Sequence, residues 1–287
     1  MKKLTRIPVF FSKKMVSRSS GQYSQSAIKP AEAVESWKSL GPIEILAPVP
    51  VSEEELCLVH DPQYIWGVMD GELPNGFGVC SKKDAASFPY TTGSMLSAAI
   101  RAMDNGKVAV APCSGFHHAG FDRAAGFCTF NGLMVTAKVL KRDKLARKVG
   151  ILDFDQHYGD GTEDLIKGLK ASTWIKHFSA GQYYHSAEDV PGFMTDIPKI
   201  VAWMADCDVI LYQAGADPHV NDPLGGWLTT TQLFKRDQLV FEHAHALGVP
   251  VAWNLAGGYQ TPLSRVLKIH DNTMRACMSE YLTEPKE

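Results

Sequence analysis

The sequence lacks any cysteine pattern typical of a disulfide framework or of a cysteine-based zinc site. No CxxC pair occurs, and the cysteines are scattered along the whole chain. We therefore expect reduced thiols that pack in the protein core. The residues concerned are Cys57, Cys80, Cys113, Cys128, Cys207 and Cys277.

The sequence also has little charge imbalance. It contains 29 basic and 31 acidic residues, which gives a net charge of −2, and it contains no block of basic residues. This balance argues against sustained binding to nucleic acid, because such binding uses a clustered positive surface. Any charged partner is therefore expected to contact the protein only locally.

Long apolar runs are missing as well. No run approaches the roughly 20 residues that a transmembrane helix needs. At the N-terminus, Ser12 and Lys13 follow MKKLTRIPVFF before an apolar segment of signal-peptide length develops. These features argue against a membrane span and predict a soluble, cytoplasmic protein.

The chain does have enough apolar sequence for a large core, in alternating strand and helix patterns. With 287 residues and 45% hydrophobic content, it is expected to form one α/β domain over residues 1–287. The predicted strands are 7–11, 43–47, 108–112, the start of 149–162, 208–213 and 249–255. The predicted helices are one after Ser52, then 92–103, 131–142, 230–247 and 262–281, whereas 17–26 and 174–184 are predicted as loops.

The stretch Val149–Thr162, VGILDFDQHYGDGT, carries the strongest local signal. It opens as a buried strand, and Asp153, Asp155 and His157 then alternate, so that in an extended chain all three point to one side. Burying several ionisable groups together is costly unless something neutralises them. One histidine with one or two carboxylates suits zinc or a similar divalent ion, although the string also fits a turn with a helix cap.

Further polar residues come directly after three other predicted strands. His117 and His118 follow the first of these strands, Asp217 follows the second, and an AGGYQ turn with Tyr259 follows the third. Ligands of open α/β sheets bind at the carboxyl ends of the strands, so we expect these side chains to lie near the metal motif. His60, which has no such position, is interpreted as structural.

Four motifs together resemble the zinc-dependent histone deacetylases of the arginase–deacetylase superfamily. They are GFHHAGFDRAAGFCTFN, ILDFDQHYGDGT, YQAGADPHVNDPLGG and AGGYQ, within roughly residues 55–265. The GFHH, DRAAGFC, DPLGG, KRDQLVF and GGYQ segments most resemble the class IV branch of this family. The resemblance implies a single domain with a central, mostly parallel sheet flanked by helices and an active site at the strand C-terminal ends.

The resemblance also implies roles for single residues. Asp155, His157 and Asp217 correspond to the ligands of one zinc ion, although such ligands also suit iron. Tyr259 corresponds to the tyrosine that stabilises the oxyanion. Family members often bind potassium through backbone carbonyls near the first zinc ligands, but in this chain the partner loop differs from the family pattern.

His117 and His118 correspond to the family's tandem histidine pair, which acts as general base and acid. By the same resemblance, Asp153 orients His117 and Asp160 orients His118. The two carboxylates would set which ring nitrogen carries a proton and would favour the charged imidazolium. The two histidines are therefore expected to differ in basicity.

The resemblance places an acyl channel beside the metal site. Gly126 and Phe127 match one wall of that channel. We assign the opposite aromatic wall to Tyr184, with Tyr183 as the alternative, although their loop departs from the family pattern.

The implied reaction is hydrolysis of the amide between an acyl group, acetyl or longer, and the side-chain amine of lysine in a protein or peptide. One alternative is an arginase-like ureohydrolase with two metal ions, which would need ligands where Gly115, Phe116 and Tyr158 stand. A second is a deacetylase of acetylated polyamines or of another small amide. A third is a non-catalytic binding module that keeps the metal.

Overall fold

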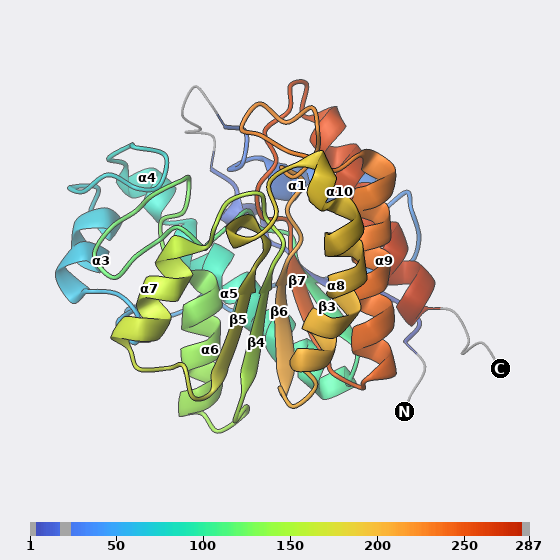
Figure 1. Cartoon of the computed structure of the whole chain (residues 1–287). Helices are drawn as coiled ribbons and strands as arrows, with labels where there is room; N and C mark the ends of the chain where they lie inside the picture. The colour runs from blue at the N-terminus through green and yellow to red at the C-terminus, as the bar shows by residue number, and fades with distance from the viewer. Residues whose placement is uncertain (1–3, 18–23, 283–287) are drawn as a thin grey trace.

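The structure is a computed structural model, and it describes residues 4–17 and 24–282. Seven parallel strands form one sheet in the order β2-β1-β3-β7-β6-β4-β5 (Figure 1). The strands are β1 (Ile7–Phe10), β2 (Ile43–Leu46), β3 (Val108–Ala111), β4 (Val149–Asp153), β5 (Ile175–Ser179), β6 (Val209–Gln213) and β7 (Val251–Asn254). The predicted α/β fold with a parallel sheet is confirmed.

Several helices begin and end where local sequence signals predict. Gly106 ends α5 with a φ of 65°, which a residue without a side chain adopts at little cost. The Asn131 side chain caps α6 by accepting a hydrogen bond from the Met134 amide. The α-helices are α1 (Lys29–Trp37), α2 (Glu53–Leu56), α3 (Pro62–Met69), α4 (Lys82–Ala85), α5 (Phe88–Asn105), α6 (Gly132–Arg142), α7 (Asp160–Gly168), α8 (Val190–Trp203), α9 (Thr230–Ala246) and α10 (Ser264–Tyr281), with short 3-10 helices η1 (Lys13–Met15), η2 (Ala180–Gln182) and η3 (Ala187–Asp189).

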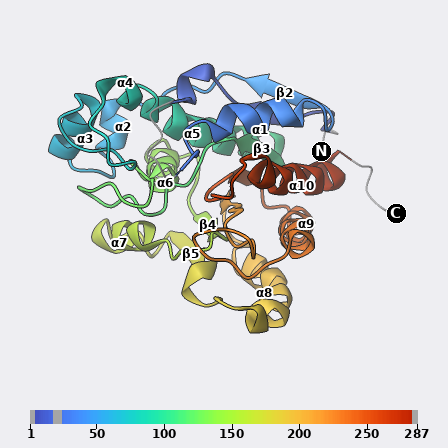
Figure 2. The ribbon, with the colours of Figure 1, turned by 90° about the horizontal axis from the view of Figure 1, so that it is seen from above.

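The sheet separates two hydrophobic cores. Successive side chains of a strand point to opposite faces. Leu152 of β4 therefore belongs to the core that contains residues of α1, α8, α9 and α10, whereas Ile151 belongs to the core that contains residues of α2, α3, α5, α6 and α7. Tyr212 and Leu211 of β6 divide in the same way. Viewed from above, α5, α6 and α7 lie on one side of the sheet and α8, α9 and α10 on the other (Figure 2).

One loop prediction is wrong, and a second is corrected in part. Residues 174–184 contain the edge strand β5, which pairs with β4 along its length. The partly exposed Lys176 and His177 gave this strand a polar pattern. In 17–26, the described residues 17 and 24–26 lie in no helix or strand, as the prediction requires. Ser17, Ser24 and Ser26 are buried, however, which corrects the expected surface position, and 18–23 lie outside the described residues.

The cysteine prediction holds for some of the residues. Four cysteines are buried free thiols, whereas Cys57 and Cys80 are exposed, which corrects the expectation that all are core thiols. Within residues 4–17 and 24–282, no helix combines the length and the apolar character that crossing a bilayer would require. The cytoplasmic location stays a prediction.

Candidate active site

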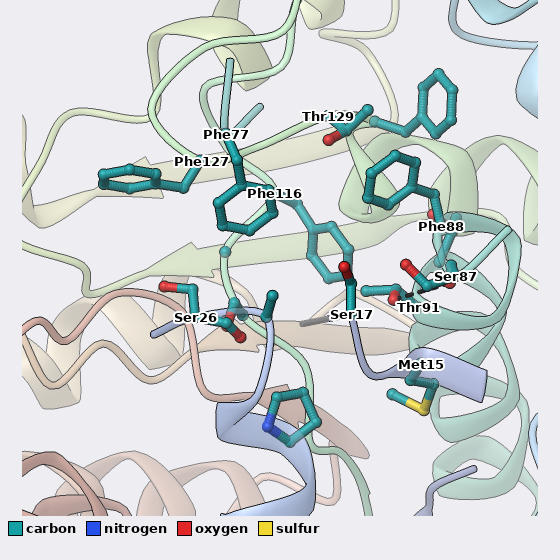
Figure 3. Close-up of a pocket in the computed structure, with 16 residues that line it drawn as sticks. Met15, Ser17, Ser26, Phe77, Ser87, Phe88, Thr91, Phe116, Phe127 and Thr129 are labelled. Carbon is teal, nitrogen blue, oxygen red and sulfur yellow. Dashed lines mark hydrogen bonds between the residues drawn. The ribbon is translucent and has the colours of Figure 1, made fainter. Parts of the chain in front are cut away.

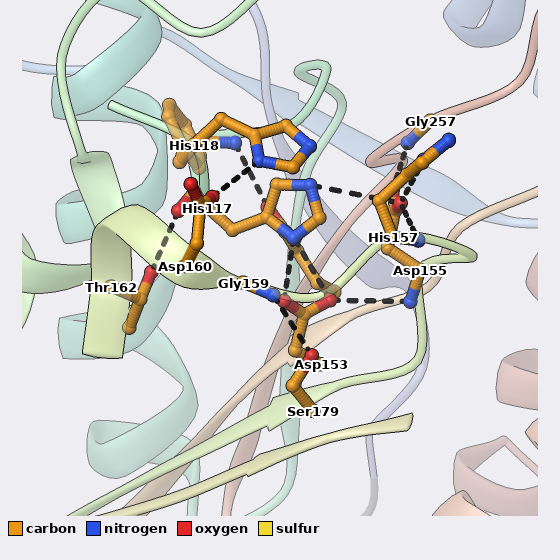
Figure 4. Close-up of polar contacts among 12 residues, drawn as sticks. His117, His118, Asp153, Asp155, His157, Gly159, Asp160, Thr162, Ser179 and Gly257 are labelled. Carbon is orange, nitrogen blue, oxygen red and sulfur yellow. Dashed lines mark hydrogen bonds and ion pairs between the residues drawn. The ribbon is translucent and has the colours of Figure 1, made fainter. Parts of the chain in front are cut away.

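The loops after β3, β4, β6 and β7 meet at the carboxyl edge of the sheet, because these four strands are neighbours in the order β3-β7-β6-β4. Each of the four strand ends for which the sequence predicts polar side chains contributes residues to this edge. Figure 4 shows the side chains from the first two loops together, with Gly257 from the loop after β7 beside them. The convergence expected from the motifs is therefore present in the structure.

Asp155, His157 and Asp217 form a cluster that could hold a metal ion. One ligand atom from each residue lies within 4.8 Å of the other two. Nδ1 of His157 is 3.3 Å from Oδ1 of Asp155 and 3.2 Å from Oδ2 of Asp217. A Cβ on Gly257 would lie only 2.2 Å from Oδ2 of Asp217, so this approach requires a glycine.

The electrostatics of this cluster favour a bound cation. Burial, together with the Asp155 carboxylate, raises the pKa of Asp217 to about 7. Burial alone would also raise the pKa of Asp155, but the His117 and His157 imidazoles outweigh it and lower that pKa. Hydrogen bonds with both carboxylates raise the pKa of His157 to about 10. Two buried carboxylates at this spacing and one imidazole are a donor set that suits a divalent ion.

Asp153 lies apart from this cluster, which corrects the expectation that Asp153, Asp155 and His157 all point to one side. β4 ends at Asp153, and Asp155 and His157 lie in the loop that follows it. Oδ2 of Asp153 accepts a hydrogen bond from Nδ1 of His117 at 2.7 Å. Its Oδ1 accepts from the Asp155 amide at 3.2 Å and from Nε2 of Gln213 at 3.0 Å.

The tandem histidines each have a carboxylate partner. His118 donates from Nδ1 to Oδ1 of Asp160 at 2.6 Å, and the two histidine ring centroids are 4.0 Å apart. A carboxylate only accepts, so both Nδ1 atoms carry protons. Nε2 of His117 is 3.6 Å from Oδ1 of Asp155, beside the metal-ligand cluster.

The two histidines differ in basicity, as the sequence predicts. Burial lowers the pKa of His117, but the Asp153 and Asp155 carboxylates outweigh it and raise this pKa to about 9. Burial, together with the neighbouring His117, lowers the pKa of His118 below its usual value. At neutral pH, His118 is therefore the stronger candidate for a neutral imidazole that accepts a proton.

Tyr259 is placed by a residue that the sequence reading missed. Its backbone amide donates to Oδ2 of Asp222 at 2.8 Å, and Oδ1 of Asp222 accepts from the Leu224 amide at 3.1 Å. Asp222 therefore ties the Tyr259 turn to the loop after β6. Its position in the DPLGG segment was available as a signal, but a turn-forming aspartate is the simpler interpretation of that segment.

The predicted channel residues separate into two groups. Gly126, with a φ of 52°, packs against His118, and a Cβ on it would lie 2.3 Å from Cδ2 of that ring. The Phe127 ring lies 5.3 Å from the Tyr259 ring, centroid to centroid.

Tyr184 belongs to another aromatic cluster. Its ring centroid lies 4.9 Å from that of Phe193 and 6.1 Å from that of Trp227, and its hydroxyl donates to Asp196 at 3.0 Å. Tyr183 is exposed and stacks on Phe178. The aromatic partners of Phe127 are Tyr259 and Phe77, whose ring centroid is 6.0 Å away, and the assignment of Tyr184 to the opposite wall stays a prediction.

A pocket with a cavity volume of about 60 Å³ lies beside Phe127 (Figure 3). Phe77, Phe116, Phe127 and Phe88 supply aromatic rings to its wall, and serine and threonine side chains supply hydroxyls. Phe116 directly precedes His117, so the pocket shares its wall with the loop that carries the tandem histidines.

Relatives of known sequence and structure agree with this fold. The chain is 29% identical over 252 residues to an uncharacterised protein of Picosynechococcus, which covers 79% of this chain and 82% of that protein. It is 27% identical over 236 residues to the acetoin utilization protein AcuC of Bacillus subtilis, which covers 67% of this chain and 60% of AcuC. The crystal structure of acetylpolyamine aminohydrolase from Burkholderia pseudomallei superposes with a TM-score of 0.73 at 17% identity, over 95% of this chain and 99% of that one, which shows a shared fold.

The family match covers the part of the chain that carries the histidine pair and two of the clustered residues. The histone deacetylase domain family matches residues 23–187, which is more than half of the sequence. Asp217 and Tyr259 lie beyond the matched segment but in the same site. The chain therefore belongs to the histone deacetylase family and is a hydrolase that acts on amide bonds.

Proposed function

We propose that the protein is a zinc-dependent deacylase that removes an acetyl or longer acyl group from the lysine side chains of proteins or peptides. The observation that carries the proposal is the meeting of the Asp155–His157–Asp217 cluster with two histidine–carboxylate pairs. Hydrolysis of an amide needs an activated water, a stabilised oxyanion and a proton for the departing amine. The site contains candidate groups for all three tasks.

The metal would be held by Asp155, His157 and Asp217. When bound, zinc lowers the pKa of a water ligand to about 7 and polarises an acyl carbonyl. The protein's own part is to keep the ligands converged. Gly257 contributes to this, since its amide donates to Oδ2 of Asp155 at 2.8 Å.

Proton movement falls to the tandem histidines. His118, whose pKa is lowered, accepts the proton of the attacking water at Nε2. Asp160 holds the proton on Nδ1 and stabilises the imidazolium that forms. The same imidazolium, or His117 with its raised pKa, then donates a proton to the departing amine. Asp153 fixes the orientation of His117.

The oxyanion and the acyl group have separate positions. The Tyr259 hydroxyl donates to the developing oxyanion, and Asp222 holds the backbone of that residue in place. Gly126 and Phe127 form the wall along which the substrate stem runs. We assign the pocket beside Phe127 to the acyl group, because its aromatic lining favours an apolar occupant (Figure 3).

The second candidate is an amidohydrolase of acetylated polyamines or of another small amide. The observation that favours it is the shared fold with acetylpolyamine aminohydrolase over nearly the whole of both chains. Both candidates use the same groups and differ in what occupies the mouth of the site. Three further statements stay proposals. They are that the chain belongs to the class IV branch, that it binds a potassium ion, and that residues 1–287 form a single domain.

The test is hydrolysis of lysine peptides that carry acetyl, octanoyl or myristoyl groups, with acetylputrescine alongside, before and after chelation and zinc restoration. We expect chelator-sensitive release of the acyl group from at least one peptide, restored by zinc. Cleavage of acetylputrescine alone would replace the proposal by the second candidate. Absence of cleavage with full metal content would indicate a binding module that keeps the metal.

A further inference from the structure

A fully buried arginine lies behind the loops that carry the proposed metal ligands. Arg236, from α9, has 0% of its surface exposed. One terminal nitrogen, Nη1, donates to the carbonyl oxygen of Phe154 at 3.1 Å and to that of Gly215 at 2.8 Å. Phe154 directly precedes Asp155, and Gly215 lies two residues before Asp217. One guanidinium therefore joins the backbones of both acidic ligand loops.

The guanidinium is itself held firmly. Its Nε donates to Oδ1 of Asp237 at 2.8 Å. The same carboxylate accepts hydrogen bonds from the hydroxyls of Tyr212 in β6 and Thr273 in α10. Asp237 is thus held from the sheet by Tyr212 and from α10 by Thr273, and loss of one of these two bonds leaves the other in place.

The two ligand loops pack closely against each other at Gly215. A Cβ on Gly215 would lie 2.8 Å from Cα of Asp155 and 2.6 Å from Oδ1 of Asp217. A shift of either carbonyl would therefore change the separation of the two carboxylates. Metal affinity depends on that separation, because the ligand atoms must converge on one ion.

The buried charge of Arg236 is not explained by its ion pair alone. A buried ion pair costs desolvation energy that its attraction often fails to repay, so it adds little net stability by itself. The two carbonyl bonds give this residue a further role. Arginine suits the role because its planar fork donates in several directions at once, which a lysine ammonium on a single stem cannot reproduce.

We infer that Arg236 is a positioning residue that holds Asp155 and Asp217 at the spacing of metal ligands. The inference rests on the proposed metal centre. It concerns how that centre is assembled, and it assigns Arg236 no contact with substrate.

The test is zinc affinity of the metal-free full-length protein, measured by competition with a chromophoric chelator. Removing a group that orients metal ligands typically weakens binding about 10–100-fold. We expect a loss of this size for Arg236→Met, which keeps the bulk and removes the donors. Arg236→Lys keeps the charge but cannot reach both carbonyls and Asp237, so we expect it to stay about 10-fold weaker than the unmodified protein.

Thr273→Val is the matched control. It removes one hydrogen bond to Asp237 from the same buried network and leaves both carbonyl bonds of Arg236 in place. We expect it to lower the unfolding temperature while zinc affinity stays within about twofold of the unmodified protein. As a second readout, the visible spectrum of the cobalt(II) form should change in both Arg236 variants and stay the same in Thr273→Val.

The outcomes separate the inference from the proposed function. If the unmodified protein binds no zinc, the metal centre is wrong and the inference falls with it. If the unmodified protein binds zinc and either Arg236 variant binds it equally tightly, the positioning role alone is overturned. All measurements are made below the unfolding temperature of each variant, and Arg236→Lys decides the question if Arg236→Met does not fold.

Discussion

His60 offers a test of the structure that is independent of catalysis, because its neutral form is built into the fold. The side chain is fully buried. Nδ1 donates to the Gly120 carbonyl at 2.8 Å, and Nε2 accepts from the Asn131 amide at 2.9 Å. Both ring nitrogens are therefore satisfied in one neutral tautomer, and a proton on Nε2 would break the second bond. These contacts lie at either end of the loop that follows the tandem histidines.

The size of the effect follows from proton linkage. Burial lowers the pKa of His60 from 6.5 to about 4. As the pH falls, His60 therefore binds a proton in the unfolded chain at a higher pH than in the folded protein. The stability that the neutral ring contributes is complete above pH 6.5 and is lost as the pH falls towards 4. Linkage over these two pKa values gives a decrease of about 2 kcal/mol in the free energy of unfolding between pH 7.5 and pH 5.

The assay is urea unfolding at a series of pH values for the unmodified protein, His60→Gln and His60→Leu. Both variants remove the titration, so both should flatten the pH dependence by about 2 kcal/mol over this range. Their absolute stabilities should differ, since glutamine keeps hydrogen-bonding groups and leucine does not. Parallel curves for all three proteins would show that His60 is not held neutral and would refute this account of its environment.

Three further predictions concern the site. Tyr259→Phe should lower turnover about 10²–10³-fold with metal content unchanged, and normal turnover would exclude its hydroxyl from the mechanism. Asp217→Ala should lower bound metal in elemental analysis, whereas one retained ion per chain would contradict the ligand assignment. Gly126→Ala would place a Cβ 2.3 Å from the His118 ring, so turnover should fall while the circular dichroism spectrum is kept, and an active variant would show that this contact relaxes freely.

Much of the fold could be predicted because the strands that build it are short apolar runs with clear ends. The exceptions have a local cause. β5 lies at the edge of the sheet and tolerates Lys176 and His177, so its pattern is polar. α8 contains Pro198 in its interior, and sequence rules interpret an interior proline as a helix breaker. Packing of Phe193 and Ile197 in the core stabilises this helix in spite of that proline.

The candidate site was predicted strand by strand, but its internal support was not. The carboxyl ends of β3, β4, β6 and β7 each ended in polar residues that a local pattern reveals. Gln213 and Arg236 are different, because each looks ordinary in its own element. Gln213 is the last residue of an apolar strand, and Arg236 lies in an amphipathic helix where a surface charge is the default interpretation. Only the strand order and the helix packing bring them to Asp153 and to the ligand loops.

Ala256, in the AGGYQ turn, has a backbone conformation that favours glycine. It stands before Gly257 with a φ of 52°, a conformation that costs a residue with a side chain about 1–2 kcal/mol. Its carbonyl accepts a hydrogen bond from the buried Lys29 ammonium at 2.6 Å, and the next amide, from Gly257, donates to Asp155. Burial lowers the pKa of Lys29 to about 8, with the Asp217 carboxylate opposing that shift. Two hydrogen bonds to charged groups therefore hold this strained turn in place, and one of these groups is a proposed metal ligand. Backbone strain of this kind persists where surrounding contacts fix it.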